Sequence, residues 1–110
     1  YAQARLFLNS QTPIERAHII NAFRFELSRV QTPAVRERML SGLRNVDDAF
    51  ASEIAAGLGI RELPPAMPKV LTQEVTPEVE VSPALSLMSR PGDGSIAARR
   101  VAVLVADGAE

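Results

Sequence analysis

The stretch from Thr12 to Val30, TPIERAHIINAFRFELSRV, decides the fold of this chain, because it carries the signals of one long amphipathic helix. Thr12 is placed to cap the helix and Pro13 to form its first turn. Glu15 follows three residues after Thr12, which is the spacing of a capping box, in which each side chain accepts a hydrogen bond from the other residue's backbone amide. The helix is therefore predicted to begin after Thr12 and to end near Val30.

One apolar stripe runs the length of this predicted helix, with its members three or four residues apart. The stripe consists of Ile19, Phe23, Leu27 and Val30. Ile20 widens it, whereas Ala22 and Phe25 lie off it, so more than one face of the helix is expected to be covered. The charged residues that we expect to stay in solvent are Arg16, Arg24, Glu26 and Arg29.

A second helix is predicted from Pro33 to about Arg44, because Gln31-Thr32-Pro33 repeats the start signal of residues 11–13. Val35 stands where a capping box would have a glutamate. The expected apolar stripe of this helix is Val35, Met39 and Leu43, with Leu40 beside it. Its expected solvated face is Arg36, Glu37, Arg38 and Arg44.

A third helix is predicted from Asp48 to about Leu58, with Asn45 or Asp47 as its cap. Its apolar positions are Phe50, Ile54 and Leu58, and Ala51 and Ala55 allow close approach of a neighbouring helix. Gly59 followed by Ile60 is typical of a left-handed helix stop. Residues 1–11 predict a short helix or an extended arm, so the first half of the chain is built around three predicted helices.

Proline interrupts the second half of the chain, where six of the eight prolines lie between Pro64 and Pro91. About sixty residues are then left for a core, which is a marginal size for an independent domain. The proline-rich part is expected to be an extended connector laid over a larger body. Within it, Val75–Val81 predicts at most an edge strand or a polyproline-like stretch, and residues 82–88 are expected to dock their leucines on another surface.

The apolar run from Val101 to Ala106 is continuous, which predicts a buried parallel strand that opens an α/β domain. The run is far too short to span a bilayer. The chain begins at Tyr1 without an initiator methionine and stops just after this predicted strand, so we expect it to be a piece of a longer protein.

Composition argues against several classes of function. The formal net charge is −1 and the charges are spread along the chain, so there is no basic patch for nucleic acid and no polybasic membrane anchor. The chain has no cysteine, which removes disulfides, thiolate nucleophiles and zinc–thiolate sites. This composition suits a reducing compartment, and we expect a cytoplasmic protein.

No catalytic, cofactor-binding or metal-binding residue is predicted in this span. His18 is the only histidine, and without a second histidine or a cysteine it is expected to be a surface or interface residue rather than a ligand or proton shuttle. Three connector carboxylates match no calcium-loop spacing and are expected to be solvated: Glu74, Glu78 and Glu80. Gly92-Asp93-Gly94 is interpreted as a turn rather than a phosphate loop, and Asp107 as a turn residue rather than a site residue.

Several short stretches, taken together, carry a more specific signal. They are Tyr1–Phe7, Thr12–Glu15, His18–Ile20, Phe25–Val30, Val35–Met39, Asn45–Asp47 and Gly57–Ile60. In this order they resemble the C-terminal helical part of monofunctional haem catalases. The proline-rich connector with Ser82–Leu87, and the predicted strand Arg100–Gly108, are similar to the large-subunit class of that family. That class adds a linker and a flavodoxin-like domain after the helical region.

The resemblance implies a mainly α span with three parts. Residues 1–62 would be the catalase C-terminal helical region, 63–98 an extended linker, and 99–110 the truncated first strand of the α/β flavodoxin-like domain. It implies a parent protein that disproportionates hydrogen peroxide to water and oxygen at a buried haem and assembles as a homotetramer. The family's catalytic residues lie upstream, so none is carried onto this sequence, and Tyr1 is not assigned as a haem ligand.

This span is accordingly expected to be scaffold, with the remainder of the catalase chain and the other subunits as its partners. A stand-alone, non-enzymatic helical interaction or oligomerisation module is the alternative, and it would fold and bind a partner alone. The uncovered apolar stripe and the unpaired strand disfavour it, because both promote aggregation in isolation. An α/β enzyme cut at its first strand, with residues 1–98 as an accessory arm, is a third reading.

Overall fold

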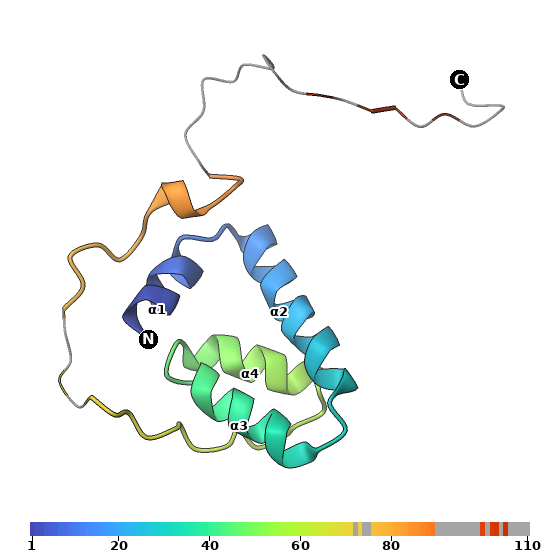
Figure 1. The fold of residues 1–110 in the computed structure, drawn as a ribbon, viewed down its shortest axis with the longest axis vertical. Coiled ribbons are helices and arrows are strands. Elements are labelled where there is room, and N and C mark those ends of the chain that lie inside the picture. Colours follow the sequence, from blue (N-terminus) through green and yellow to red (C-terminus); the bar gives the residue numbers. More distant parts are fainter. Residues whose placement is uncertain (72, 74–75, 90–99, 101, 104, 106–110) are drawn as a thin grey trace.

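The computed structural model describes residues 1–71, 73, 76–89, 100, 102–103 and 105. Within these residues the chain forms four α-helices, one short 3-10 turn and no strand (Figure 1). The elements are α1 (Ala2–Asn9), α2 (Pro13–Arg29), α3 (Pro33–Leu43), α4 (Asp48–Gly57) and the turn η1 (Pro83–Leu85). The three predicted helices are confirmed as α2, α3 and α4, and residues 2–9 form a helix rather than an extended arm.

Helix α2 begins with the predicted capping box. The Glu15 amide donates to Thr12 Oγ1 at 3.4 Å, and Glu15 Oε2 accepts from the Thr12 amide at 2.9 Å. The helix ends at Arg29, where Val30 turns to extended backbone. Leu27 is buried as predicted, and Ile20, which was expected only to widen the stripe, is buried with it. The other members of the stripe pack against the core while partly exposed: Ile19, Phe23 and Val30.

The predicted stripe of α3 is wrong in part. Leu40 is fully buried and Leu43 packs against the core, but Val35 and Met39 are exposed. The cause is that α3 packs mainly on one neighbour, α4, and a helix with one neighbour buries only a narrow strip. Thr32 occupies the cap position of α3, but its side chain makes no capping hydrogen bond.

Helix α4 is capped by Asp47, whose Oδ1 accepts from the Phe50 amide at 2.6 Å. The helix stops as predicted, because Gly59 has a left-handed backbone with φ of +73° and the Ile60 amide donates back to the Ala55 carbonyl. Helix α4 also carries half of the buried apolar residues of the described chain: Phe50, Ala51, Ile54 and Ala55.

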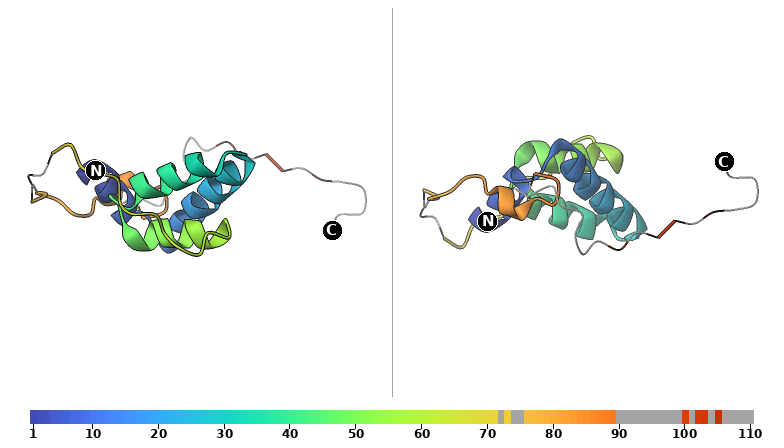
Figure 2. Two further views of the ribbon diagram at one scale, coloured as in Figure 1. Left: turned by 90° about the horizontal axis from the view of Figure 1, so that it is seen from below. Right: turned by 90° about the horizontal axis from the view of Figure 1, so that it is seen from above.

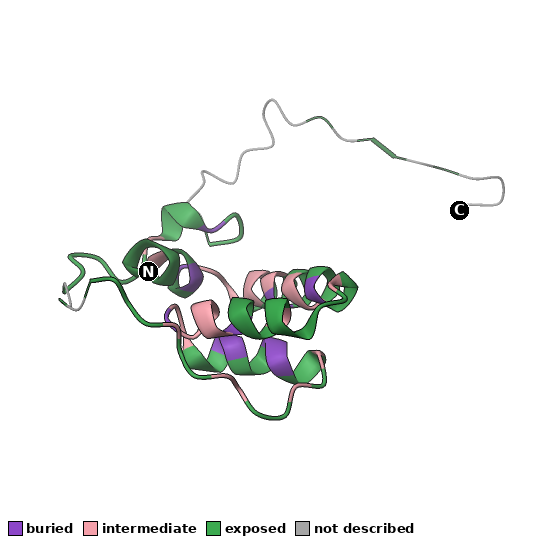
Figure 3. Ribbon diagram, turned by 60° about the horizontal axis from the view of Figure 1, so that its bottom comes forward, coloured by how far each residue is buried: buried purple, intermediate pink, exposed green. Residues whose placement is uncertain are grey.

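The core lies where α4 meets α2 and α3. Figure 3 shows buried positions gathered on α4 and on the sides of the helices that face it, while the outer surface of α3 is exposed. Leu8 brings α1 into the same cluster. Among the described residues no helix has the length and apolarity needed to cross a membrane.

The described residues between α4 and η1 form no helix or strand and return toward the start of the chain. Figures 1 and 2 agree that this connector runs back along the α3–α4 pair to the N-terminal end, where η1 lies beside α1. The described positions of the predicted strand, Ala102, Val103 and Val105, are exposed and form no strand. The rest of that run lies outside the described residues, and so do Glu74, Gly92-Asp93-Gly94 and Asp107. The α/β domain therefore stays a prediction.

Candidate functional site

The described part of the chain contains no cluster of three or more histidine, cysteine, aspartate or glutamate side chains that could hold a metal ion. His18 lies on the exposed side of α2, as expected, and Tyr1, Glu78 and Glu80 are exposed as well. The structure brings none of these predicted candidates together. What it does assemble is a set of polar contacts between the helices and the connector.

Three polar residues are buried in the described chain, and each takes part in a hydrogen bond between the helical part and the connector. They are Ser10, Asn45 and Ser86, which are 4%, 5% and 1% exposed. Every buried side-chain nitrogen or oxygen among the described residues has a hydrogen-bond partner. Because a buried polar group is costly unless it is paired, these three positions mark where the connector is fixed.

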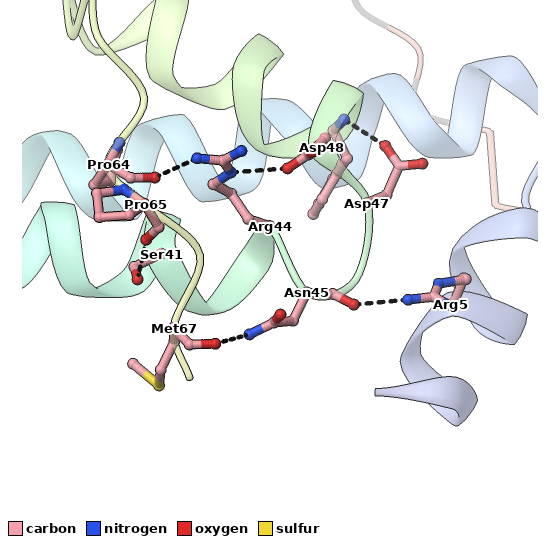
Figure 4. Close-up of polar contacts among 10 residues, drawn as sticks. Arg5, Ser41, Arg44, Asn45, Asp47, Asp48, Pro64, Pro65 and Met67 are labelled. Carbon is pink, nitrogen blue, oxygen red and sulfur yellow. Dashed lines mark hydrogen bonds and ion pairs between the residues drawn. The ribbon is translucent and has the colours of Figure 1, made fainter. Parts of the chain in front are cut away.

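The first docking point lies at the end of α3, where the backbone of residues 64–67 is held (Figure 4). Ser41 Oγ donates to the Pro65 carbonyl at 2.6 Å, and the Met67 amide donates to the Ser41 carbonyl at 2.9 Å. Asn45 Nδ2 donates to the Met67 carbonyl at 2.8 Å. Proline has no amide hydrogen, so this connector is bound largely through its carbonyl oxygens.

Arg44 completes the first docking point from the same turn. Its Nη1 donates to the Pro64 carbonyl at 2.8 Å, and its Nε donates to Asp48 Oδ1 at 2.8 Å (Figure 4). The hydrogen bond from Arg44 lowers the pKa of the Asp48 carboxyl, and the same hydrogen bond raises the pKa of Arg44. Arg44 is therefore a bridge between α4 and the connector, and its prediction as a solvated residue is wrong.

Other arginines that were expected in solvent are also partly buried and engaged. Arg16 pairs with Asp47 at 3.1 Å, Arg24 Nη2 donates to the Glu53 carbonyl at 2.7 Å, and Arg36 Nε donates to the Val30 carbonyl at 2.6 Å. The last two contacts place a cation near the C-terminal end of a helix, where the helix dipole favours it. Arg5 of α1 likewise donates to the carbonyls of Asn45 and Val46, both at 2.9 Å. The guanidinium groups tie the helices together.

The second docking point lies at the corner between α1 and α2 and is organised by Glu15. Glu15 Oε2 accepts from Ser86 Oγ at 2.7 Å, and Glu15 Oε1 accepts from the Leu87 amide at 2.8 Å. The pKa of the Glu15 carboxyl is lowered from 4.5 to about 2. The largest cause is the hydrogen bond from Ser86, and the next is the hydrogen bond from the Thr12 amide. Glu15 is thus an anion that serves the helix cap and the connector together.

Two neighbours extend this second docking point. The Ser82 amide donates to Ser10 Oγ at 2.8 Å, and Gln11 Nε2 donates to the Leu85 carbonyl at 3.1 Å. Leu85 and Leu87 are 41% and 88% exposed within the described residues, so the expected docking of these leucines on another surface stays a prediction. Within this chain the segment is bound through Ser86 and its backbone. The capping-box position of Glu15 was readable in the sequence, but nothing there indicated its second partner.

A hollow of about 730 Å³ opens between the start of α1 and the connector. Its lining includes Tyr1, Arg5, Met67, Val70 and Leu71. The guanidinium of Arg5 is already bound to backbone carbonyls, and Val70 and Leu71 are largely exposed. The hollow thus combines apolar surface with polar side chains that include Tyr1, Lys69, Gln73 and Thr76.

Comparison with known proteins gives a consistent result. The family described as catalase-related immune-responsive matches residues 1–58. Over its whole length the chain is 44% identical to catalase HPII of Mycobacterium avium and 41% identical to catalase C of Rhizobium meliloti (strain 1021). Over 98% of its length it is 40% identical to catalase-2 of Bacillus subtilis (strain 168). The chain spans only 14%, 15% and 14% of these relatives, respectively. No solved structure matches it.

Proposed function

This chain belongs to the catalase-related family, and we propose that it is a structural part of a haem catalase that converts hydrogen peroxide to water and oxygen. The observation that carries the proposal is the match to catalase HPII, which covers the whole chain but only 14% of the relative. An alignment of that kind is expected when a chain corresponds to one segment of a longer enzyme. The parent protein is then a catalase, and the catalytic residues lie outside this span.

We propose that the described residues do not hold the haem. The histidine and the tyrosine of this chain are both exposed, and the described residues offer no metal-ligating cluster. Arg5 and Arg16, the cations nearest the start of the chain, are already engaged with backbone or carboxylate oxygens. We therefore assign no haem contact to these residues, and we place the haem of the parent protein among residues beyond this chain.

The scaffold role is supported by apolar side chains left on the outer helix faces. These are Phe7 on α1, Ile14 and Phe25 on α2, and Val35 and Met39 on α3, with exposed fractions between 43% and 60%. We propose that these side chains belong to an interface in the parent protein. The partner we propose is the remainder of the catalase chain, with other subunits of a homotetramer bound beyond it.

The second half of the chain is proposed to join the helices to a further domain. Residues 63–98 would be the linker and 99–110 the first strand of a flavodoxin-like α/β domain. Val103 and Val105 are 78% and 71% exposed here, and helices packed on the faces of a parallel sheet would cover them. A cytoplasmic location completes the proposal.

The experiment that tests this function is the intact mass and visible spectrum of the native protein, captured through an antibody against residues 12–30. A subunit several times heavier than this chain, with a haem Soret band, is the expected result. A mass equal to that of this chain, without haem, would overturn the proposal and favour a stand-alone helical interaction module.

A further inference from the structure

The Glu15 carboxylate has a second role that its position in the helix cap does not require. Its Oε2 accepts from the Thr12 amide and hydroxyl, both at 2.9 Å, and from Ser86 Oγ at 2.7 Å. Its Oε1 accepts from the amides of Leu87 and Met88 at 2.8 and 3.3 Å. A capping box needs only the contacts with Thr12. The three contacts from residues 86–88 belong to a segment about seventy positions away in the sequence.

Ser86 is built to serve this contact. It is 1% exposed, and while its hydroxyl donates to Glu15 its oxygen accepts from the amides of Met88 and Ser89 at 3.1 and 2.8 Å. Three consecutive amides, those of residues 87–89, are thereby turned toward Glu15 and Ser86. Hydrogen bonds to an ionised carboxylate are the stronger kind.

The connector has little else to hold it just before this point. Residues 76–81 are all exposed, and so are Leu85 and Leu87. Apolar burial therefore contributes little to fixing residues 86–89. Their position depends mainly on the polar contacts. The nearest support is a pair of hydrogen bonds upstream of Ser86. The Ser82 amide donates to Ser10, and Gln11 donates to the Leu85 carbonyl.

We infer that Glu15 is an anchor that fixes residues 86–89 on the corner between α1 and α2. We call the contacts of Glu15 with residues 86–88 the Glu15 anchor. Glu15 acts in these contacts as a positioning residue. The inference does not depend on the haem or on peroxide chemistry, because it rests only on contacts within this chain.

The lowered pKa of Glu15, about 2, agrees with such an anchor. The Glu15 carboxylate is therefore ionised at neutral pH, and it accepts the hydrogen bonds of the anchor as an anion. Among the described residues the donors to Glu15 are all neutral: Thr12, Ser86, Leu87 and Met88.

Hydrogen exchange of the full-length protein at neutral pH tests the anchor, read at the amides of residues 87–89. Ser86→Ala removes the hydroxyl that donates to Glu15 and leaves the capping box of Thr12 and Glu15 intact. In Glu15→Gln an NH2 group replaces one of the two carboxylate oxygens. Because both oxygens accept hydrogen bonds, the NH2 group faces another donor in either orientation of the amide. Ser82→Ala is the matched control, because the Ser82 side chain makes no capping hydrogen bond. Glu26→Gln, exposed on the same helix, controls for the lost charge.

Exchange of amides 87–89 is expected to rise at least about tenfold in Ser86→Ala and Glu15→Gln, since each loses charge-assisted hydrogen bonds. The two controls should match the wild type, and α4 should exchange at its original rate in all variants. Unchanged exchange in Ser86→Ala would overturn the anchor, even if Glu15→Gln unfolded α2. The anchor would also be overturned if amides 87–89 exchanged faster in Ser86→Ala but at the wild-type rate in a folded Glu15→Gln. The turn at Ser86 alone would then hold the segment. Visible spectra of the same samples report the haem separately.

Discussion

The rings of Phe23 and Phe50 meet edge to face, with centroids 5.7 Å apart and planes at 86°. Phe23 comes from α2 and Phe50 from α4, so the pair joins the longest helix to the most buried one. The Arg16 guanidinium lies 6.0 Å from the centre of the Phe50 ring, which adds a cation–π contact to the same junction. This edge-to-face geometry is the favoured one for aromatic pairs.

Truncating Phe50 should therefore be more damaging than truncating Phe23. Phe50 is 3% exposed, so Phe50→Ala is expected to cost about 3–5 kcal/mol. Phe23 is only partly buried, so Phe23→Ala should cost about half as much. Thermal melting of the full-length variants measures both, and an equal loss in melting temperature would show that Phe23 is covered by something beyond this chain.

Acid should weaken the contribution of Glu15 to stability. Its pKa is near 2 in the folded chain and ordinarily 4.5, so the charged form is favoured by folding. The stabilisation is then fully present above about pH 4.5 and is lost as the pH falls from there toward 2.

The measurement is the melting temperature of wild type, Glu15→Gln and Glu26→Gln across that pH range. The wild type should exceed Glu15→Gln by a constant margin near neutrality, and the margin should shrink below about pH 4.5. Glu26→Gln removes an equal charge from an exposed position of the same helix, α2. An identical pH profile for the two variants would contradict the assignment.

Much of the helical half could be predicted from the sequence, because its signals are local. The Thr12 and Glu15 capping box, the Asp47 cap and the Gly59 stop each depend on residues within a few positions of one another. Such short-range chemistry fixes where helices begin and end before any tertiary contact forms.

The contacts of the connector could not be predicted in the same way. Glu15 meets Ser86 across 71 positions, and Asn45 meets Met67 across 22. Arg44 and Arg36 resemble ordinary surface charges in the sequence, yet each binds a carbonyl that some other segment leaves free. Every residue has a backbone carbonyl, so the sequence does not indicate which carbonyl an arginine will bind. Only the folded structure shows it. The exposure of Val35 and Met39 likewise depends on how many helices surround α3.

Two glycines offer a matched test of close packing. A Cβ at Gly57 would overlap the Nε, Cδ and Cγ atoms of Arg24, which is held by the Glu53 carbonyl, whereas a Cβ at Gly42 would meet nothing within 4 Å. Gly42→Ala should stabilise α3 by about 0.5–1 kcal/mol through helix propensity. Gly57→Ala should instead cost about 1–3 kcal/mol through overpacking. Melting temperatures that rise alike in both variants would refute the Arg24 contact.

Asn45 tests the first docking point of the connector. Asn45→Ala removes the donor to the Met67 carbonyl at a position that is 5% exposed, so a loss of about 1–3 kcal/mol is expected. Asn9→Ala, on an exposed position of α1, should stay within about 0.5 kcal/mol of the wild type. Limited proteolysis within residues 61–71 should accelerate in Asn45→Ala alone, and equal cleavage of both variants would contradict the role of Asn45.

The outer face of α2 provides the sharpest test of the proposed scaffold role. Phe25 is 60% exposed within this chain, with the Arg29 guanidinium 5.4 Å from its ring centre, so this chain by itself gives little reason for Phe25→Ala to destabilise. If the remainder of a catalase covers the face, the same substitution in the full-length protein should approach the cost of truncating a buried phenylalanine, about 3–5 kcal/mol. Glu26→Ala, the exposed neighbour, is the control and should leave the melting temperature nearly unchanged. If Phe25→Ala in the full-length protein were as mild as Glu26→Ala, this face would be solvent-exposed in the parent protein and the proposed interface would be wrong.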